Sequence, residues 1–474
     1  MLKPYRTISA IQEDLKLGSV TCNELVEYYL QNIENNKHLN AFVDVYADEA
    51  LEQARIIDEK VKNGTAGRLA GAVIGLKDVI SYKDHSLQAG SKILSGYNAL
   101  YNATVVDRLL SEDAIIIGRQ NCDEFAMGSS NESSSFGPVS NAADVTKVPG
   151  GSSGGSAVAV QADLCHASLG SDTGGSVRQP ASFCGTVGLK PSYGRVSRWG
   201  LIAYASSFDS IGPITKSVDD AALLLEVIAG ADEYDSTVSS KEVPSYSTTA
   251  MDVKPLRIGY LKEGLDEKAV QEEVRENTQN LLDKLKSEGH VVEEVNLPLV
   301  QYILPTYYIL TTAEASSNLS RFDGVRYGHR STEVTDLESL YKKTRSEGFG
   351  AEVKRRILLG TFVLSASYYD AYYTKAQRVR QILVDKTKEL LNQYDFIVSP
   401  VAPTTAFKIG EKMEDPLQMY LADIFTVQAN LIGFPAISIP NGEDKEGMPV
   451  GVQVMAGAFE EQNLLAFGKY IESL

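Results

Sequence analysis

Short apolar segments alternate with amphipathic, helix-like segments along most of the chain, and this alternation limits its possible folds most strongly. Helices are expected over residues 17–35, 47–63, 218–228, 268–287 and 353–394, with a further helix at the end of the chain. The apolar segments between them predict strands at residues 72–80, 114–118, 256–261, 291–295, 394–398, 436–439 and 451–455. Such alternation is typical of α/β folds, in which helices pack on the faces of a sheet.

Local patterns mark the ends of two of these helices. Thr21-Cys22-Asn23-Glu24 matches a capping box, and Ser217 precedes the helix that begins at residue 218. The polar, Ser- and Thr-rich residues 234–254 predict an exposed loop rather than a linker between domains. No internal repeat is found.

The charge of the chain bears on its partners. Its 474 residues include 45 basic and 62 acidic side chains, which gives a net charge of −17. A surface of this sign repels polyanions, so the chain alone is expected to bind tRNA or DNA poorly and to need a basic partner subunit for that purpose. A hydrophobic content of 43% and a charged content of 23% exclude the disordered and fibrous classes.

No apolar stretch approaches the ~18 residues that a membrane-spanning helix requires, so no membrane association is expected. Acidic residues occur near the N-terminus before any apolar segment, which argues against a secretory signal and favours a cytoplasmic location. The four cysteines are Cys22, Cys122, Cys165 and Cys184. They are scattered without metal-ligand spacing, so we expect free buried thiols and no structural zinc site.

Glycine and serine are concentrated in the middle of the chain. Residues 150–200 contain 11 of the 38 glycines, together with nine serines. A flexible linker has this composition, but apolar runs and charged residues such as Arg178 and Lys190 interrupt the segment. Backbone that closely approaches a bound group, with its N–H groups turned toward it, also requires glycine. We therefore interpret the segment as part of a binding or catalytic site.

The run Gly150-Gly-Ser-Ser-Gly-Gly-Ser156 has three interpretations. A phosphate-binding loop would need a lysine where Ser156 stands. A nucleophile elbow fits the pattern G-x-S-x-G, but residues 139–149 do not resemble a strand, and neither His290 nor His329 has the context of a catalytic loop. The third interpretation is a serine activated by a lysine that burial keeps neutral.

Lys77 is the candidate for that lysine because it lies inside the apolar run Val73–Ile80. Alternatively, it is a half-buried strand lysine that pairs with Asp78 or another acid. A second motif, Thr173-Gly174-Gly175-Ser176, presents successive N–H groups beside a hydroxyl, as an oxyanion hole next to a nucleophile requires. An ordinary turn would have the same composition.

Taken together, these motifs resemble the amidase-signature family, whose members use a Ser–cis-Ser–Lys triad. The resemblance rests on Lys77 in GLKD, Ser152 in GGSSGGS and Ser176 in GSDTGGSVRQP, and it covers nearly the whole chain. It implies one α/β domain over residues 1–474, with a mixed central β-sheet covered by helices on both faces. It also implies that Ser176 is the nucleophile, that Ser152 follows a cis peptide bond and relays a proton, and that Lys77 is the base. The N–H groups of Thr173, Gly174, Gly175 and Ser176 would bind the oxyanion.

Within that family, the chain resembles the glutaminase subunits of tRNA-dependent amidotransferases. The segments behind this closer match are residues 123–137, 190–198, 321–328, 359–364 and 368–373. The resemblance implies that Arg356 binds the α-carboxylate of glutamine, that Asp423 pairs with its α-ammonium group, and that Tyr307, Gly128 and Ser129 contact it. From the residues alone, Arg356 and Asp423 are better explained as surface charges and Tyr307 as a core aromatic.

The implied function is hydrolysis of glutamine, with ammonia passing to a partner subunit that converts Glu-tRNA(Gln) to Gln-tRNA(Gln), and formation of Asn-tRNA(Asn) from its misacylated precursor stays open as a second use. The resemblance implies a heterotrimer with B and C subunits, in which misacylated tRNA, ATP and Mg²⁺ bind on the partner's side. It implies no metal and no organic cofactor on this chain. Two alternatives stay open: a free-standing amidase for small amides, and a catalytically silent scaffold protein.

Overall fold

The computed structural model describes residues 4–249, 255–297, 299–412 and 416–474. Within these residues, eleven strands form one sheet in the order β1-β3-β2-β4-β6-β5-β10-β11-β9-β7-β8. Four neighbouring pairs are parallel and six are antiparallel, so the sheet is mixed. The strands are β1 Phe42–Val45, β2 Val73–Lys77, β3 Ile115–Gln120, β4 Ala167–Asp172, β5 Val187–Lys190, β6 Ser210–Thr215, β7 Arg257–Leu261, β8 Val291–Val295, β9 Phe396–Pro400, β10 Ala436–Glu443 and β11 Pro449–Met455.

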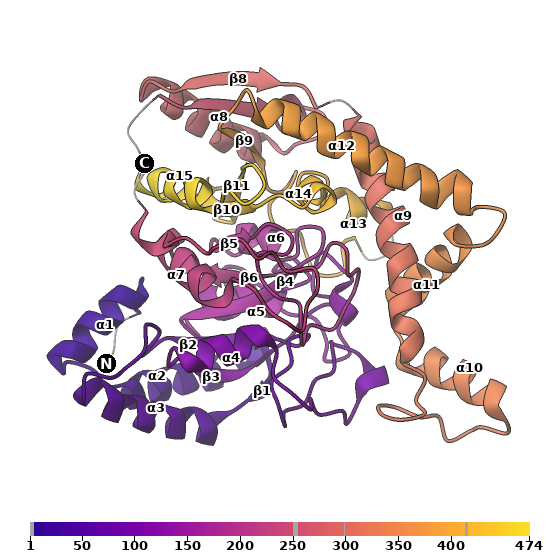
Figure 1. Cartoon of the computed structure of the whole chain (residues 1–474), viewed down its shortest axis with the longest axis horizontal. Helices are drawn as coiled ribbons and strands as arrows, with labels where there is room; N and C mark the ends of the chain where they lie inside the picture. The colour runs from indigo at the N-terminus through magenta and orange to yellow at the C-terminus, as the bar shows by residue number, and fades with distance from the viewer. Residues whose placement is uncertain (1–3, 250–254, 298, 413–415) are drawn as a thin grey trace.

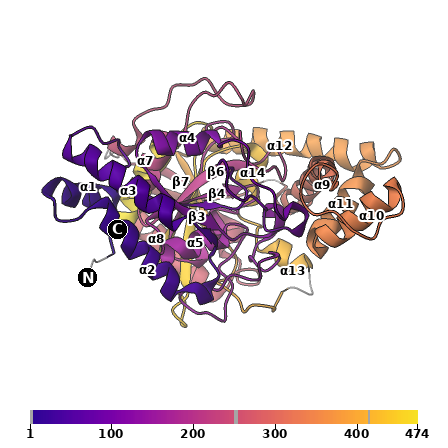
Figure 2. The ribbon, with the colours of Figure 1, turned by 90° about the horizontal axis from the view of Figure 1, so that it is seen from below.

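Helices cover both faces of this sheet, with α4 and α7 on one side and α2 and α5 on the other (Figure 2). The helices are α1 Ile8–Leu17, α2 Cys22–Asn35, α3 Ala47–Lys62, α4 Thr104–Ser111, α5 Gly154–Gln161, α6 Arg178–Phe183, α7 Val218–Ile228, α8 Glu272–Ser287, α9 Val300–Asn318, α10 Leu337–Gly348, α11 Ala351–Val363, α12 Lys375–Leu391, α13 Pro416–Leu421, α14 Val427–Ile432 and α15 Glu461–Ser473. The predicted fold class, an α/β fold with a mixed central sheet between layers of helices, is confirmed.

The strand sequences explain why both faces are covered. Side chains of a strand point alternately to its two faces. Accordingly, Val73 and Ile115 belong to the core with α2, α3 and α5, whereas their neighbours Ile74 and Ile116 belong to the core with α4, α7 and α15. All residues of β2 and β3 are buried, as is expected for strands that are apolar on both faces.

Most of the predicted elements are found, with shifted ends. The capping box at Thr21 is present at the start of α2, and the Ser217 side chain accepts a hydrogen bond from the Asp220 N–H group at the start of α7. Residues 234–245 contain no helix or strand, as predicted for a loop, but Tyr246–Thr248 form a short 3₁₀ helix with Tyr246 buried, so the prediction of an exposed loop is wrong there. Residues 250–254 lie outside the described residues. All four cysteines are buried and free.

The predicted single helix over residues 353–394 is wrong. It is two helices, α11 and α12, separated by a short π-helix at Tyr369–Thr374. Ser365 explains part of the break, because its hydroxyl donates to the Phe362 carbonyl and its carbonyl accepts from the N–H groups of Tyr368 and Tyr369. Serine side chains compete in this way with regular helix hydrogen bonds.

Helices α9, α10 and α11 and the beginning of α12 lie at the end of the molecule opposite both chain termini (Figure 1). The sequence patterns described above do not predict α1, α9 or α10. None of the helices in the described residues is long and apolar enough to cross a membrane.

Candidate active site

Lys77 and Ser152 form the centre of the candidate site. Lys77 is the last residue of β2, and Ser152 lies two residues before α5. Both side chains are buried, and Lys77 Nζ lies 2.7 Å from Ser152 Oγ. The Gly151–Ser152 peptide bond is cis, as the family resemblance implied.

Burial also determines the ionisation of Lys77. It lowers the pKa of the ammonium group to about 8, because desolvation penalises the charged form. Asp78 does not compensate this charge, because its carboxylate accepts from Arg119 Nη1 at 2.5 Å. In the described part of the chain no carboxylate lies within ion-pair distance of Lys77; its other hydrogen-bond partners are the hydroxyl and carbonyl oxygens of Ser171. The expectation of an acid-paired strand lysine is therefore not met.

Ser176 lies in the loop that connects β4 to α6, beside the segment that contains Ser152. The N–H group of Ser153 donates to the Ser176 carbonyl at 3.1 Å and so joins the two serine motifs. The Ser176 side chain is close to the surface, since the residue keeps 8% of its exposure, whereas Ser152 has none. Ser152 thus contacts the buried lysine, and the residue after it is bonded to the backbone of the more accessible Ser176.

Asp172, the last residue of β4, fixes the shape of this loop. Its carboxylate accepts hydrogen bonds from the N–H groups of Gly175 at 2.8 Å and Val177 at 3.1 Å. The buried guanidinium of Arg178 donates to the same carboxylate at 3.0 and 3.1 Å. Although burial acts to raise it, the pKa of Asp172 is held well below its usual range, chiefly by the charge of Arg178.

The four predicted oxyanion N–H groups are not equivalent. The Gly175 N–H group is bonded to Asp172, whereas those of Thr173, Gly174 and Ser176 have no protein acceptor within the described residues. Close packing explains the glycines here: a Cβ on Gly174 would lie 2.3 Å from the Tyr307 hydroxyl, and one on Gly175 would lie 2.2 Å from Thr426 Oγ1. Tyr307 therefore lies directly against the loop that contains Ser176.

Arg356 on α11 is buried rather than a surface charge. Its Nε donates to Glu352 Oε1 at 2.8 Å and its Nη1 donates to the Tyr204 hydroxyl at 2.8 Å. The guanidinium also lies over the rings of Tyr204, Tyr308 and Tyr420, at 5.4–5.6 Å from their centroids. In the described residues no protein acceptor is found for Nη2, so this donor is available to a bound anion.

Asp423 is also buried and follows α13. Its Oδ2 accepts from Ser129 Oγ at 2.8 Å and from the Tyr308 hydroxyl at 3.4 Å. Burial raises the pKa of this carboxyl to about 7, and the nearby charge of Arg356 lowers it only in part. Opposite charges near each other in a buried pocket match a small zwitterionic ligand.

A cavity of about 210 Å³ brings several of these residues together. Gly128, Ser129 and Arg356 line it, and they come from segments far apart in the sequence. Gly128 is required there because a Cβ would lie 2.3 Å from the Asp123 carboxylate carbon. The structure thus brings together all the predicted site residues in two adjoining groups, one around Ser152 and one around Arg356, connected through Tyr307 and Tyr308.

Four partners of these residues are absent from the sequence predictions: Ser171, Tyr204, Tyr308 and Glu352. Two of them leave a signal in the sequence. Ser171 belongs to the same motif as Ser176, and Glu352 precedes Arg356 by four residues on a helix, which is ion-pair spacing. Tyr204 has no such signal, because it contacts Arg356 across a long sequence separation.

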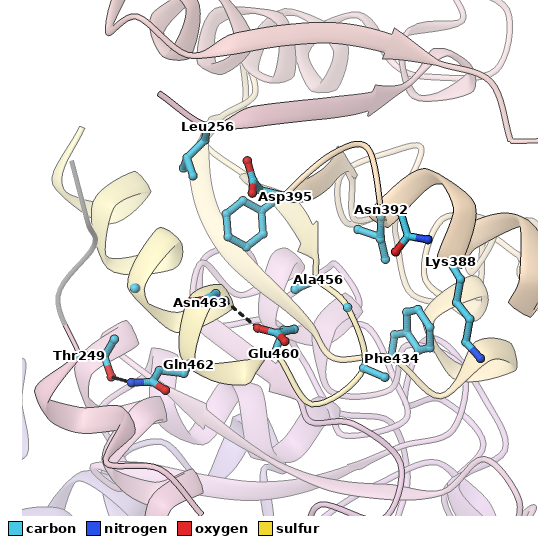
Figure 3. A pocket seen from close by; sticks show the side chains of 15 residues that line it. Thr249, Leu256, Lys388, Asn392, Asp395, Phe434, Ala456, Glu460, Gln462 and Asn463 are labelled. Atoms are coloured by element: carbon cyan, nitrogen blue, oxygen red, sulfur yellow. Dashed lines mark hydrogen bonds between the residues drawn. The ribbon is translucent and has the colours of Figure 1, made fainter. Parts of the chain in front are cut away.

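A second cavity, of about 650 Å³, lies between the end of α12 and the start of α15 (Figure 3). Lys388, Asp395, Phe434 and Glu460 are among its lining residues, and none of the predicted site residues is among those described there. No group of three or more His, Cys, Asp or Glu side chains placed to hold a metal ion occurs in the part of the chain that the structure describes.

Comparison with known proteins agrees with this geometry. A model of the amidase family matches residues 24–465. The A subunit of glutamyl-tRNA(Gln) amidotransferase from Chlorobaculum tepidum is 52% identical over 468 residues, which is 98% of this chain and 97% of the relative. The crystal structure of the corresponding A subunit from Thermotoga maritima superposes with a TM-score of 0.78 at 41% identity, covering 95% of this chain and 91% of that one. Native peptide amidase from Stenotrophomonas maltophilia superposes with a TM-score of 0.82 at 27% identity, covering 98% and 96%. The chain therefore belongs to the amidase family.

Proposed function

We propose that this chain is the glutaminase subunit of a tRNA-dependent amidotransferase and that it acts through Lys77, Ser152 and Ser176. The observation that supports this most strongly is the 2.7 Å contact between Lys77 Nζ and Ser152 Oγ, in a buried position where no carboxylate of the described residues lies within ion-pair distance of the amine. A lysine with a pKa of about 8 is neutral in part of the molecules near neutral pH and accepts a proton from a hydroxyl.

In the proposed reaction, neutral Lys77 accepts a proton from Ser152, and Ser152 accepts the proton of the Ser176 hydroxyl. Ser176 Oγ then attacks the carboxamide carbon of glutamine. The N–H groups of Thr173, Gly174 and Ser176 stabilise the negative oxygen. The Gly175 N–H group, which the family resemblance also assigned to this role, stays bonded to Asp172 and holds the loop.

The tetrahedral intermediate then collapses to products. The proton held by Lys77 returns through Ser152 to the leaving nitrogen, so that ammonia departs and a glutamyl ester remains on Ser176. Water, deprotonated through the same serine and lysine, attacks the ester, and the proton returns through Ser152 to Ser176 Oγ as the ester bond breaks and glutamate leaves. Each step moves one proton, and Lys77 ends neutral, as it began.

The pocket residues select glutamine among amides. Arg356 Nη2 binds the α-carboxylate, since this donor faces no protein acceptor in the described residues. Asp423, with Ser129 beside it, pairs with the α-ammonium group. Tyr307 borders the amide portion of the ligand, because it contacts the loop that contains Gly174. Gly128 borders the amino-acid portion, because it lines the cavity.

The partners follow from the relatives, whose names describe them as A subunits of glutamyl-tRNA(Gln) amidotransferases. We propose that the whole chain, residues 1–474, assembles in the cytoplasm with B and C subunits as a heterotrimer. Ammonia passes to the partner, where ATP, Mg²⁺ and misacylated tRNA bind, and this chain holds no cofactor of its own. The net charge of −17 agrees with tRNA binding outside this chain.

The proposal is tested by incubating the chain with glutamine, alone and with co-expressed partner subunits. Ammonia release and a glutamyl adduct on the Ser176 peptide, detected by mass spectrometry after an acid quench, are the expected results. A control with Ser176→Ala must show neither. Equal turnover of simple aliphatic amides, with no partner protein found in the native host, would identify a free-standing amidase instead.

A further inference from the structure

An exposed apolar patch lies on the helical end of the molecule, outside the active site. It consists of Leu358, Leu359, Phe362, Tyr368, Tyr369 and Tyr372, which are between 41% and 70% exposed. Residues 365–372, which comprise most of the connection after α11 and the first four residues of the π-helix, are all exposed. Large contiguous apolar surfaces of this kind mark interaction sites in proteins that fold on their own.

The aromatic members of this patch pack on one another rather than on a core. The ring of Phe362 lies 4.3 Å from that of Tyr368 and 5.9 Å from that of Tyr372, centroid to centroid. Phe362, Tyr368 and Tyr372 therefore form one aromatic cluster, and Tyr369 packs beside it on Tyr373. Aromatic side chains of this kind are enriched at the centres of protein interfaces, where they bury large areas at a low cost in conformational entropy.

The charge around the patch differs from that of the rest of the chain. Residues 351–391 contain eight basic and four acidic side chains, a net charge of +4, although the whole chain has −17. Lys375 and Arg378 are exposed at the start of α12, and neither has an acidic partner within 4 Å in the described residues. The patch is thus apolar at its centre and basic at its edge, which is complementary to an apolar surface with an acidic rim.

The patch is also close to the proposed substrate pocket. Leu358, Leu359 and Phe362 follow Arg356 on the same helix, and a rise of 1.5 Å per residue places Phe362 about 9 Å along the axis. The first turn of α11, including Arg355, lines the 210 Å³ cavity. A protein seated on the patch would therefore stand beside the pocket, at the end of the molecule opposite both termini (Figure 1).

We infer that this patch is the docking surface for the partner subunit that receives the ammonia, with Phe362 and Leu358 as apolar anchors and Lys375 and Arg378 as contacts to its acidic rim. The inference rests on the proposed function, which requires a partner near the site of ammonia release.

The test measures assembly of the full-length chain with purified B and C subunits of the same organism, by sedimentation and titration calorimetry. Leu358→Asp and Phe362→Asp are each expected to weaken the complex at least tenfold. The double variant Lys375→Glu with Arg378→Glu is expected to weaken it and to reduce its salt dependence.

Leu17→Asp is the matched control, because Leu17 is 77% exposed and Leu358 is 70% exposed. Leu17→Asp should assemble like the wild type, and all variants should keep the wild-type melting temperature within about 2 °C because the residues are exposed. If Phe362→Asp does not fold, the milder Phe362→Ser replaces it.

Each outcome has a separate meaning. If the wild type assembles with its partners and the patch variants assemble equally well, the docking surface is overturned and the proposed function is left intact. A wild type that does not assemble with either of the other two subunits overturns both. The isolated wild-type chain is also tested for binding of a tRNA transcript. If it binds and Phe362→Asp abolishes the binding, the patch is an RNA site and the assignment to a protein partner is overturned.

Discussion

The amine of Lys77 lies 2.7 Å from the hydroxyl of Ser152, and both side chains are buried. In most proteins a buried lysine is paired with a carboxylate, which keeps it charged. Here the neighbouring carboxylate, Asp78, is bonded to Arg119 instead. The lysine is thereby left with neutral hydroxyl and carbonyl partners, and desolvation by burial lowers its pKa to about 8. This relationship is the basis for the predictions on catalysis.

The rate of glutamine hydrolysis is expected to rise with pH through about 8, because only neutral Lys77 accepts the proton. Lys77→Arg keeps the charge and cannot lose its proton, and Lys77→Met removes the amine. Each is expected to reduce kcat by roughly 10³-fold in a glutaminase assay. Circular dichroism checks that both variants are folded. Turnover by Lys77→Arg at the wild-type rate would exclude Lys77 as the base.

Binding of glutamine is expected to depend on the ionisation of Asp423. Its pKa of about 7 means that the carboxylate becomes protonated as the pH falls below 7, so kcat/KM for glutamine should fall there. Asp423→Asn should remove this dependence and reduce kcat/KM at pH 8 roughly 100-fold, about 3 kcal/mol, because the α-ammonium group loses its partner. Arg356→Ala should have a similar effect. A small amide without α-amino and α-carboxylate groups is the control substrate, and equal losses on it would indicate a role in folding instead.

The pair formed by Arg178 and Asp172 is expected to be the main support of the nucleophile loop. Arg178→Met keeps most of the volume but leaves the buried Asp172 without its cation, and should reduce the free energy of unfolding in urea by about 3–5 kcal/mol. Since the pKa of Asp172 is depressed in the folded state, the stabilisation is present above its ordinary value of 3.8 and is lost as the pH falls further. Adding Asp172→Asn to Arg178→Met should recover part of the loss. A single variant as stable as the wild type would show that the pair is dispensable.

The fold class was predictable because the local patterns agree with the tertiary structure. The capping residues Thr21 and Ser217 stand at the starts of α2 and α7, and the apolar segments coincide with strands that are buried on both faces. The triad was predictable because its members lie in short motifs rich in glycine, which the close packing around Gly174 and Gly175 requires.

Features that depend on distant contacts were not predictable in the same way. No glycine or proline marks the break between α11 and α12. Helix α9 contains Pro305, and its buried positions do not form one regular stripe, so its sequence does not show a helical pattern. The hydrogen bond of Tyr204 to Arg356 joins residues 152 positions apart. The hydrogen bond from the Gly175 N–H group to Asp172 also depends on the folded shape of the loop, which the motif does not reveal.

The most direct test of the account uses a complex in which this chain has Ser176→Ala. The nucleophile is needed only to release ammonia from glutamine, whereas amidation of the misacylated tRNA needs ammonia from any source. The complex should assemble, because the change removes one oxygen from a loop that Asp172 and Arg178 still hold. With glutamine as donor it should form no amidated tRNA, and with an ammonium salt at a pH where NH₃ is present it should form it at the wild-type rate. Amidation of the tRNA with glutamine at the wild-type rate would contradict Ser176 as the nucleophile. If an intact complex forms no amidated tRNA with ammonium, the claim that Ser176 serves only to hydrolyse glutamine would be contradicted.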